Sequence, residues 1–233
     1  MSILRFLTPL VFLLLSHFCA AGEPGRKVLI MGNSITLHAP APNIGWTGNW
    51  GMAASTEDKD YVHLLLADLE KSWGERPRSK VKNIADFERG HGAFDVAAKL
   101  RDELAFGADV VILAIGENAA ELTTAEAKVA FSQALVKLLK AFKSHGNPAI
   151  FVRSCFWPNA AKDEILSKAC NEVGGTFVDI STLGKDPAMK ASAERKIEHT
   201  GVAGHPGDKG MRAIADAIFG SIQKHLPVRD QKK

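Results

Sequence analysis

Five short apolar runs, separated by longer segments with helical periodicity, limit what this 233-residue chain can fold into. The runs are continuous and rich in β-branched residues, which is typical of strands buried on both faces of a sheet. They lie at 27–31, 109–115, 149–153 and 176–180, and a weaker run lies at 80–84. The helical patterns lie at 55–71, 95–105, onward from a cap at Thr123 or Thr124, 162–171 and 208–224. This alternation predicts a three-layer α/β fold with a five-stranded parallel, doubly wound sheet.

The first 21 residues have the layout of a secretory signal peptide. A single base, Arg5, precedes an apolar run from 6 to 15, and the small residues Ala20 and Ala21 follow. We therefore expect cleavage, a single mature domain at 22–233, and a secreted or periplasmic location. Lipidation of Cys19 is the alternative, which the bulky Phe18 before it disfavours.

Charge and length exclude several classes of partner. The chain has 29 Lys and Arg against 26 Asp and Glu, and its densest basic stretch, 76–82, is short. Nucleic-acid binding therefore has no support from composition. The N-terminal apolar run falls well short of the ~20 residues needed to span a bilayer, so we expect no stable membrane insertion after cleavage. The histidines have no metal-ligand spacing, and we expect neither a metal nor another cofactor.

Two cysteines, Cys155 and Cys170, remain in the mature chain. One ends a predicted strand, and the other lies near the far end of the helix that runs back along it. This places them at opposite ends of a layer, beyond the ~7 Å that a disulfide allows between Cα atoms. We expect two buried thiols.

Three side chains with catalytic potential follow predicted strands or precede the last helix. Ser34 comes after the first strand, Asn118 after the third, and His205 just before the final helix. The carboxyl ends of parallel strands meet at one edge of the sheet, where ligands bind in such folds. A serine, an amide donor and a histidine are the parts that nucleophilic acyl transfer needs.

At these positions the sequence resembles the SGNH or GDSL-type hydrolase superfamily, over residues 27 to about 224. The segments that resemble its first, third and last blocks are 32–34 (Gly-Asn-Ser), 116–118 (Gly-Glu-Asn) and 204–206 (Gly-His-Pro). Asn33 stands where aspartate is commoner, and Gly90 is the candidate for the second block. The resemblance implies a flavodoxin-like fold and a serine esterase. In it, Ser34 is the nucleophile, His205 the general base, and Ser34, Gly90 and Asn118 form the oxyanion hole.

The last block departs from the family pattern at Val202, where the superfamily usually has the aspartate that orients the histidine. A backbone carbonyl near Val202 could hold the imidazole, giving a Ser–His dyad, which we favour. Alternatively, another acid reaches in, such as Glu198 or Glu117; Asp208 lies on the wrong side of His205. A catalytically inactive member of the fold is a third possibility.

The irregular segment 38–54 follows the first strand on the ligand side and carries Trp46 and Trp50. Indoles can stack on sugar rings, although they can equally pack the insertion onto the core. With secretion, they favour an O-acyl carbohydrate, most simply an acetyl ester, over a lipid, and Glu117 is a further candidate for substrate binding. The alternative function is a catalytically impaired glycan-binding protein that uses the same cleft.

Overall fold

The computed structural model describes residues 25–226, so the expected signal peptide lies outside the described residues. Five parallel strands form one sheet in the order β2-β1-β3-β4-β5. Their bounds are β1 Lys27–Gly32, β2 Arg78–Asn83, β3 Val110–Ala114, β4 Ala149–Arg153 and β5 Thr176–Val178. The predicted three-layer α/β fold with a five-stranded parallel sheet is confirmed.

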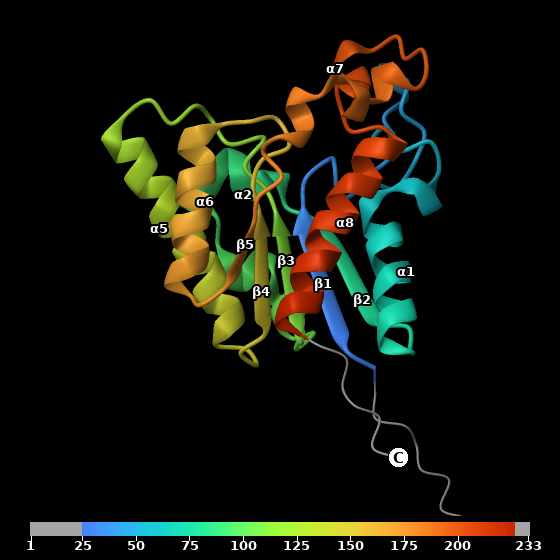
Figure 1. Cartoon of the computed structure of the whole chain (residues 1–233). Coiled ribbons are helices and arrows are strands. Elements are labelled where there is room, and N and C mark those ends of the chain that lie inside the picture. Colours follow the sequence, from blue (N-terminus) through green and yellow to red (C-terminus); the bar gives the residue numbers. More distant parts are fainter. Residues whose placement is uncertain (1–24, 227–233) are drawn as a thin grey trace, which may run out of the picture.

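Helices cover both faces of the sheet (Figure 1). One face carries α1 (Tyr61–Trp73) and α8 (Asp208–His225), which pack against each other. The other carries α5 (Ala125–Lys143) and α6 (Ala160–Glu172), together with shorter helices beside β2. These shorter helices are α2 Ala85–Gly90, α3 Val96–Lys99 and α4 Arg101–Leu104, and α7 Thr200–Ala203 precedes α8.

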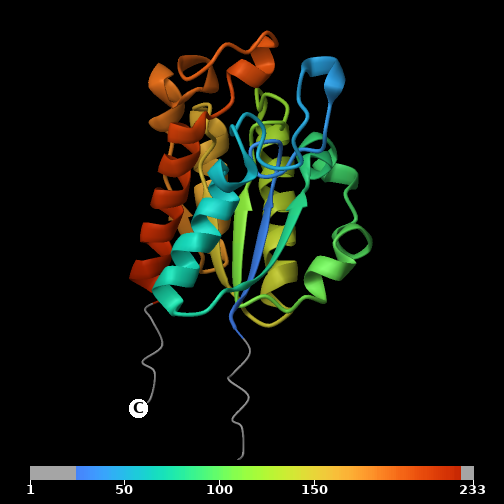
Figure 2. The ribbon, with the colours of Figure 1, turned by 90° about the vertical axis from the view of Figure 1, so that its right-hand side faces the viewer.

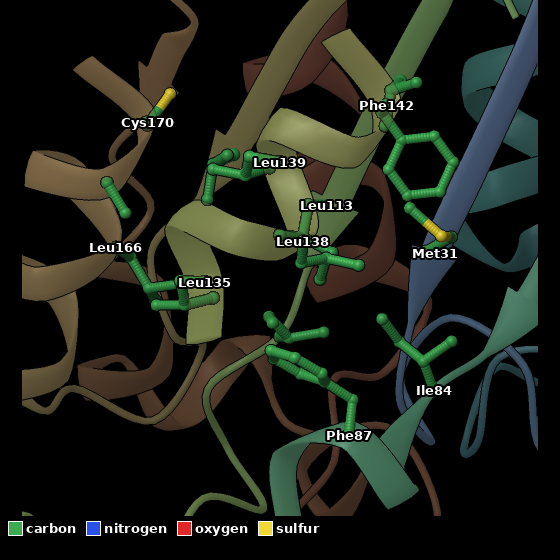
Figure 3. Packing of buried hydrophobic residues seen from close by; sticks show 14 of the residues in the cluster. Met31, Ile84, Phe87, Leu113, Leu135, Leu138, Leu139, Phe142, Leu166 and Cys170 are labelled. Carbon is green, nitrogen blue, oxygen red and sulfur yellow. The ribbon is translucent and has the colours of Figure 1, made fainter. Parts of the chain in front are cut away.

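Residues of β1 and β3 alternate between two apolar cores, because successive side chains of a strand point to opposite faces. Val28 and Ile30 pack under α1 and α8, whereas Leu29 and Met31 pack under α5. Figure 3 shows part of the core under α5, in which Phe142 lies close to Met31 and Leu135 lies close to Leu166. All four of these β1 side chains are fully buried, as the continuous apolar run predicts.

Two helix predictions were wrong in detail. The helix expected from residue 55 begins at Tyr61, because Asp60 rather than Ser55 accepts the capping hydrogen bond, from the backbone N–H of His63. The Ser55 hydroxyl instead donates to Asp208, at the start of α8. The helix expected over 95–105 is divided at Leu100 into α3 and α4.

The carboxyl ends of the strands point to the end of the molecule where the longest connections gather (Figure 2). The blue segment after β1 and the orange segment before α8 both lie there. Within residues 25–226, no helix is both long and apolar enough to cross a membrane. Cys155 and Cys170 are buried and unpaired, which confirms the prediction of two buried thiols.

Candidate active site

Ser34 lies on a tight turn directly after β1. The carbonyl oxygen of Asn33 accepts hydrogen bonds from the backbone N–H groups of Thr36 and Leu37, both at 3.0 Å. A Cβ at Gly32 would lie 1.9 Å from Oγ1 of Thr36, so this turn needs glycine there. The backbone N–H of Ser34 has no partner within residues 25–226. Ser34 therefore presents both a hydroxyl and a free N–H at the end of the strand.

His205 meets Ser34 across the top of the sheet. Its Nε2 lies 2.9 Å from Ser34 Oγ, and its Nδ1 lies 2.7 Å from the carbonyl oxygen of Gly201 in α7. A carbonyl can only accept a hydrogen bond, so Nδ1 must carry the proton. In the neutral ring, Nε2 is then the acceptor for the Ser34 hydroxyl, which is the tautomer that a general base requires.

None of the three acids considered from the sequence reaches this imidazole. Glu198 is 86% exposed and pairs with Lys196. Asp208 accepts from Ser55, and Glu117 points into the protein interior toward Arg153. The arrangement matches the favoured sequence interpretation, in which a backbone carbonyl holds the ring and the candidate pair is a Ser–His dyad.

Burial lowers the pKa of His205 below its ordinary value, although the Gly201 carbonyl opposes this shift. Trp157, two residues beyond Cys155, packs edge-on against the imidazole, with ring centroids 5.0 Å apart. Its Nε1 donates to the carbonyl of Gly204, so it also fixes the segment that carries His205. The ring is thus held on two sides, and its burial favours the neutral form.

The predicted oxyanion hole is only partly assembled. Asn118 follows β3, and its Nδ2 donates one hydrogen to Glu88 Oε2 at 2.8 Å; the second hydrogen has no partner within the described chain. Gly116, at the start of this loop, has φ of +124°, and a Cβ there would lie 2.5 Å from Cys155 Sγ. Only glycine suits that position, which explains why the Gly-Glu-Asn segment at 116–118 begins with it.

The structure does not support Gly90 as an oxyanion donor. Gly90 is the exposed last residue of α2, and a Cβ there would meet nothing within 4 Å. The expected loop after β2 is helical from Ala85, so Gly90 lies about 7 Å along the helix from the strand end. Ala85 and Arg89 of this helix line the cleft instead. The Ala85 N–H donates to Asn83 Oδ1 at 2.9 Å.

Glu117 does not face a substrate either. Its side chain is 2% exposed and forms a 2.6 Å ion pair with the fully buried Arg153. Its carboxylate also accepts from Asn33 Nδ2 at 2.7 Å and from the backbone N–H of Phe156 at 2.8 Å. Burial acts to raise the pKa of Glu117, but the pairing with Arg153 holds it below its ordinary value. It is a structural carboxylate beneath the site.

The two tryptophans of the 38–54 segment pack that segment together rather than forming a sugar platform. Trp46 is 6% exposed and contacts Trp50 edge-to-face, with ring centroids 5.5 Å apart. The Trp46 indole donates to the carbonyl of His38, and that of Trp50 to Ala54. Neither is among the residues that line the cleft, so the substrate-binding role predicted for them is not supported.

A cleft of about 320 Å³ opens beside Ser34 and His205. Its apolar wall comes from Ile44, Met52 and Val202. The remaining lining residues are polar, small or basic: His38, Asn83, Ala85, Arg89, His199 and Gly201. Within residues 25–226, no group of three or more His, Cys, Asp or Glu side chains is placed to hold a metal ion. The cleft has room for a small acyl group beside the Ser34 hydroxyl.

No protein-family model matches the sequence, and comparison with curated proteins finds no match. Solved structures do match. A protein described as a GDSL-like lipase from Bacteroides uniformis is similar at 13% identity and a TM-score of 0.55, with 87% of this chain and 97% of that chain covered. The chain has the SGNH hydrolase fold.

Two carbohydrate esterases are also similar. A family two carbohydrate esterase from Clostridium thermocellum, solved with cellohexaose, matches at 16% identity and a TM-score of 0.57, with 89% of this chain and 66% of that chain covered. An acetyl xylan esterase from Butyrivibrio proteoclasticus matches at 12% identity and a TM-score of 0.53, with 87% and 64% covered. These structures share the SGNH fold with this chain.

Proposed function

We propose that this chain is a secreted serine esterase that hydrolyses O-acyl esters, in particular acetyl esters of carbohydrates. The observation that carries the proposal is the contact of Ser34 Oγ with His205 Nε2 at 2.9 Å, in a ring whose Nδ1–H is held by Gly201. That is a hydroxyl nucleophile beside a base in the correct tautomer. It opens on a cleft large enough for an acyl group.

In the proposed reaction, His205 removes the proton of Ser34 as its oxygen attacks the ester carbonyl. The Ser34 backbone N–H and the free Nδ2 hydrogen of Asn118 stabilise the oxyanion, and one such donor is typically worth about 3 kcal/mol of barrier. As the ester C–O bond breaks, His205 then gives its proton to the departing sugar oxygen, which leaves as a hydroxyl. Water, activated by the same imidazole, releases the acid and restores Ser34.

A carbohydrate ester is supported by the size of the cleft and by the proteins that share the fold. The cleft has one short apolar wall, which fits a methyl group better than a long chain. Among similar structures, one was solved with cellohexaose and another is described as an acetyl xylan esterase. The signal-peptide layout of residues 1–21 supports export. It is tested by the intact mass of the exported protein, which should lack about the first 21 residues and carry no lipid.

The deciding experiment compares wild type with Ser34→Ala on 4-nitrophenyl acetate and on acetylated xylo- and cello-oligosaccharides. We expect turnover by wild type and loss of at least ~10³-fold in Ser34→Ala. A fluorophosphonate probe should label Ser34 alone. Ser132→Ala, on α5 at the far face of the sheet, is the matched control and should retain full activity. Labelling at another serine would reject the assignment.

The alternative, a glycan-binding protein without turnover, rests on the lack of a carboxylate at Val202. It predicts that wild type and Ser34→Ala are equally inert on every ester of the panel while both bind the oligosaccharides with the same affinity. Calorimetric titration with a deacetylated and an acetylated oligosaccharide separates the two functions.

A further inference from the structure

Four N–H donors converge on the carboxylate of Glu88, a residue of α2 that sequence reasoning did not single out. Its Oε1 accepts from the backbone N–H of Gly116 at 2.5 Å, from that of Asn118 at 3.2 Å and from Nδ2 of Asn33 at 3.2 Å. Its Oε2 accepts from Nδ2 of Asn118 at 2.8 Å. Glu88 is fully buried. Every donor belongs to a loop that carries part of the candidate site.

These contacts join the loop after β1 to the loop after β3. Asn33, which precedes Ser34, also donates through the same Nδ2 to Glu117, so one amide lies between two buried carboxylates. The nearby cation, Arg153, pairs with Glu117, and within residues 25–226 no cation forms an ion pair with Glu88. Burial and then the charge of Glu117 raise the pKa of Glu88. A buried carboxylate without a paired cation is costly to hold in a folded protein.

The neighbouring residue of α2 holds the other end of the same amide. An Nη2 hydrogen of Arg89 is donated to Oδ1 of Asn118 at 3.3 Å. The carboxylate of Glu88 can accept only from the amide nitrogen, and the guanidinium can donate only to the amide oxygen. The two contacts therefore select one of the two orientations of the Asn118 amide and leave one Nδ2 hydrogen free.

We infer that Glu88 is a positioning residue for the oxyanion hole, which acts by fixing the Asn118 amide and the Gly116–Asn118 backbone, with Arg89 as its partner. This inference rests on the proposed function, because Asn118 matters only if an oxyanion forms. It also gives a role to the buried carboxylate on α2. The amide of Asn33, which stands where aspartate is commoner, donates to this carboxylate.

Glu88→Gln is the informative substitution because it changes one atom and no shape. If the new amide keeps its oxygen toward Gly116, its nitrogen faces Nδ2 of Asn118, donor against donor. If it turns, its nitrogen faces the two backbone N–H groups. Asn118 can relieve the first conflict only by reversing its own amide, which sets its nitrogen against Arg89. In the first case the Asn118 amide moves, and in the second the Gly116–Asn118 backbone that carries it moves. The free Nδ2 hydrogen is displaced in both.

The oxyanion exists only in the transition state, so the loss should fall on kcat and leave KM nearly unchanged. We expect Asn118→Ala to lower kcat by about 10²- to 10³-fold. Glu88→Gln should lower it by about 10- to 100-fold. In the Asn118→Ala background, Glu88→Gln should cost less than about threefold, because the group through which Glu88 acts is already gone. Additive losses, or a loss expressed in KM, would overturn the inference.

The matched control is Glu103→Gln in α4. Glu103 is also buried, at 5% exposure, but its carboxylate pairs with Lys80 and Lys82 and touches no residue of the cleft. It should lower the denaturation midpoint while kcat stays within about twofold of wild type. A loss of kcat in Glu103→Gln equal to that in Glu88→Gln would mean that any buried glutamate has this effect, which also overturns the inference.

A readout independent of turnover separates this inference from the proposed function. The side-chain NH₂ signals of Asn118 in a ¹⁵N-labelled sample are assigned by their disappearance in Asn118→Ala. They should shift in Glu88→Gln and remain in place in Glu103→Gln. If wild type is inert and yet these signals move as expected, the proposed function fails and the positioning contact stands. If they do not move, the positioning contact is rejected, whatever the activity.

Discussion

Nδ1 of His205 lies 2.7 Å from the carbonyl oxygen of Gly201, one turn of chain earlier, where a carboxylate would stand in a Ser–His–Asp triad. The contact is made within the segment formed by α7 and the residues after it. A backbone acceptor cannot be removed by changing a side chain, and it carries no full charge. Orientation of the imidazole therefore depends on the conformation of this segment.

Amide substitutions of the two nearby acids, Glu198 and Asp208, should leave catalysis intact. Glu198→Gln and Asp208→Asn are expected to retain kcat/KM within about threefold of wild type, far from the ~10⁴-fold loss that follows when a triad loses its aspartate this way. The measurement is kcat/KM on 4-nitrophenyl acetate, with Ser34→Ala as the inactive reference. A fall of either variant nearly to that reference, with the fold retained, would identify a hidden third member.

Restoring the family residue with Val202→Asp should harm the protein rather than raise its rate. Val202 is 4% exposed and packs with Trp46 and Met52, so an aspartate there places an unpaired carboxylate among apolar side chains. We expect a loss of about 3 kcal/mol or more in the free energy of unfolding, measured by denaturant titration. Val202→Thr serves as the control of similar shape. A stable Val202→Asp variant with a raised kcat/KM would show that the imidazole can recruit a carboxylate.

The sheet and the proximity of Ser34 to His205 were predictable because both follow from the sequence order of the strands and helices. Continuous apolar runs fix the strands, and parallel strands bring their carboxyl ends to one edge. The acceptor for Nδ1 was predicted only as a choice between a backbone carbonyl and an acid. Side-chain patterns do not reveal where a main-chain carbonyl points, so the choice of Gly201 needed the structure.

The wrong or missing predictions concern segments in which the sequence carries no local signal. Helix α2 is only six residues long, too short to show a periodicity, so the segment read as a loop with Gly90 at its far end. The roles of Glu88 and Trp157 depend on contacts between distant segments, with no local signal beyond Trp157 following a strand end. Trp46 was predicted to bind substrate and is buried instead. The sequence of an irregular segment does not show whether an indole faces water or the protein interior.

Activity should rise with pH through a midpoint below the ordinary histidine value of ~6.5. Burial lowers the pKa of His205, and the nearby His38 and His199 act in the same direction. Below that pKa the ring is protonated and cannot accept the proton of Ser34; above it the base is ready, so kcat/KM should level off by neutral pH. The titration of the His205 ring, followed by NMR, should give the same midpoint. A midpoint clearly above 6.5 would contradict the assigned environment.

His38→Gln provides a directional check on the same environment. Removing this neighbour takes away an electrostatic interaction that lowers the pKa of His205, so the pKa of His205 and the acid limb of the activity profile should both move upward. His225→Gln, at the far end of α8, is the control and should leave the profile in place. A downward shift in His38→Gln would mean that His38 acts on His205 in some other way.

The buried thiols should be unreactive in the folded protein. Burial raises the pKa of Cys170 to about 11 and also raises that of Cys155, so neither is a thiolate at neutral pH. Iodoacetamide is expected to label neither in native protein, and both in denaturant without a reductant. Recovery of a peptide that joins Cys155 to Cys170 by a disulfide would show that the strand and helix are arranged differently.

The ion pair beneath the site should prove more important for stability than any exposed pair. Arg153 is fully buried, and two of its nitrogens, Nε and Nη2, already lack a partner among the described residues, so Glu117→Gln would leave an uncompensated cation. We expect a loss of about 3–5 kcal/mol in the free energy of unfolding at pH 7.

Because the pKa of Glu117 is held below its ordinary value, wild type should lose this stabilisation as pH falls through the folded-state pKa. The stability of Glu117→Gln should depend less on pH in the acid range. The double variant Glu117→Gln/Arg153→Met removes the orphaned charge and should recover most of the loss. Denaturant titrations of the three proteins at pH 7 and pH 4 make the comparison. Equal stability of Glu117→Gln and wild type at pH 7 would mean that Arg153 finds another acceptor, and the account of this pair would have to be abandoned.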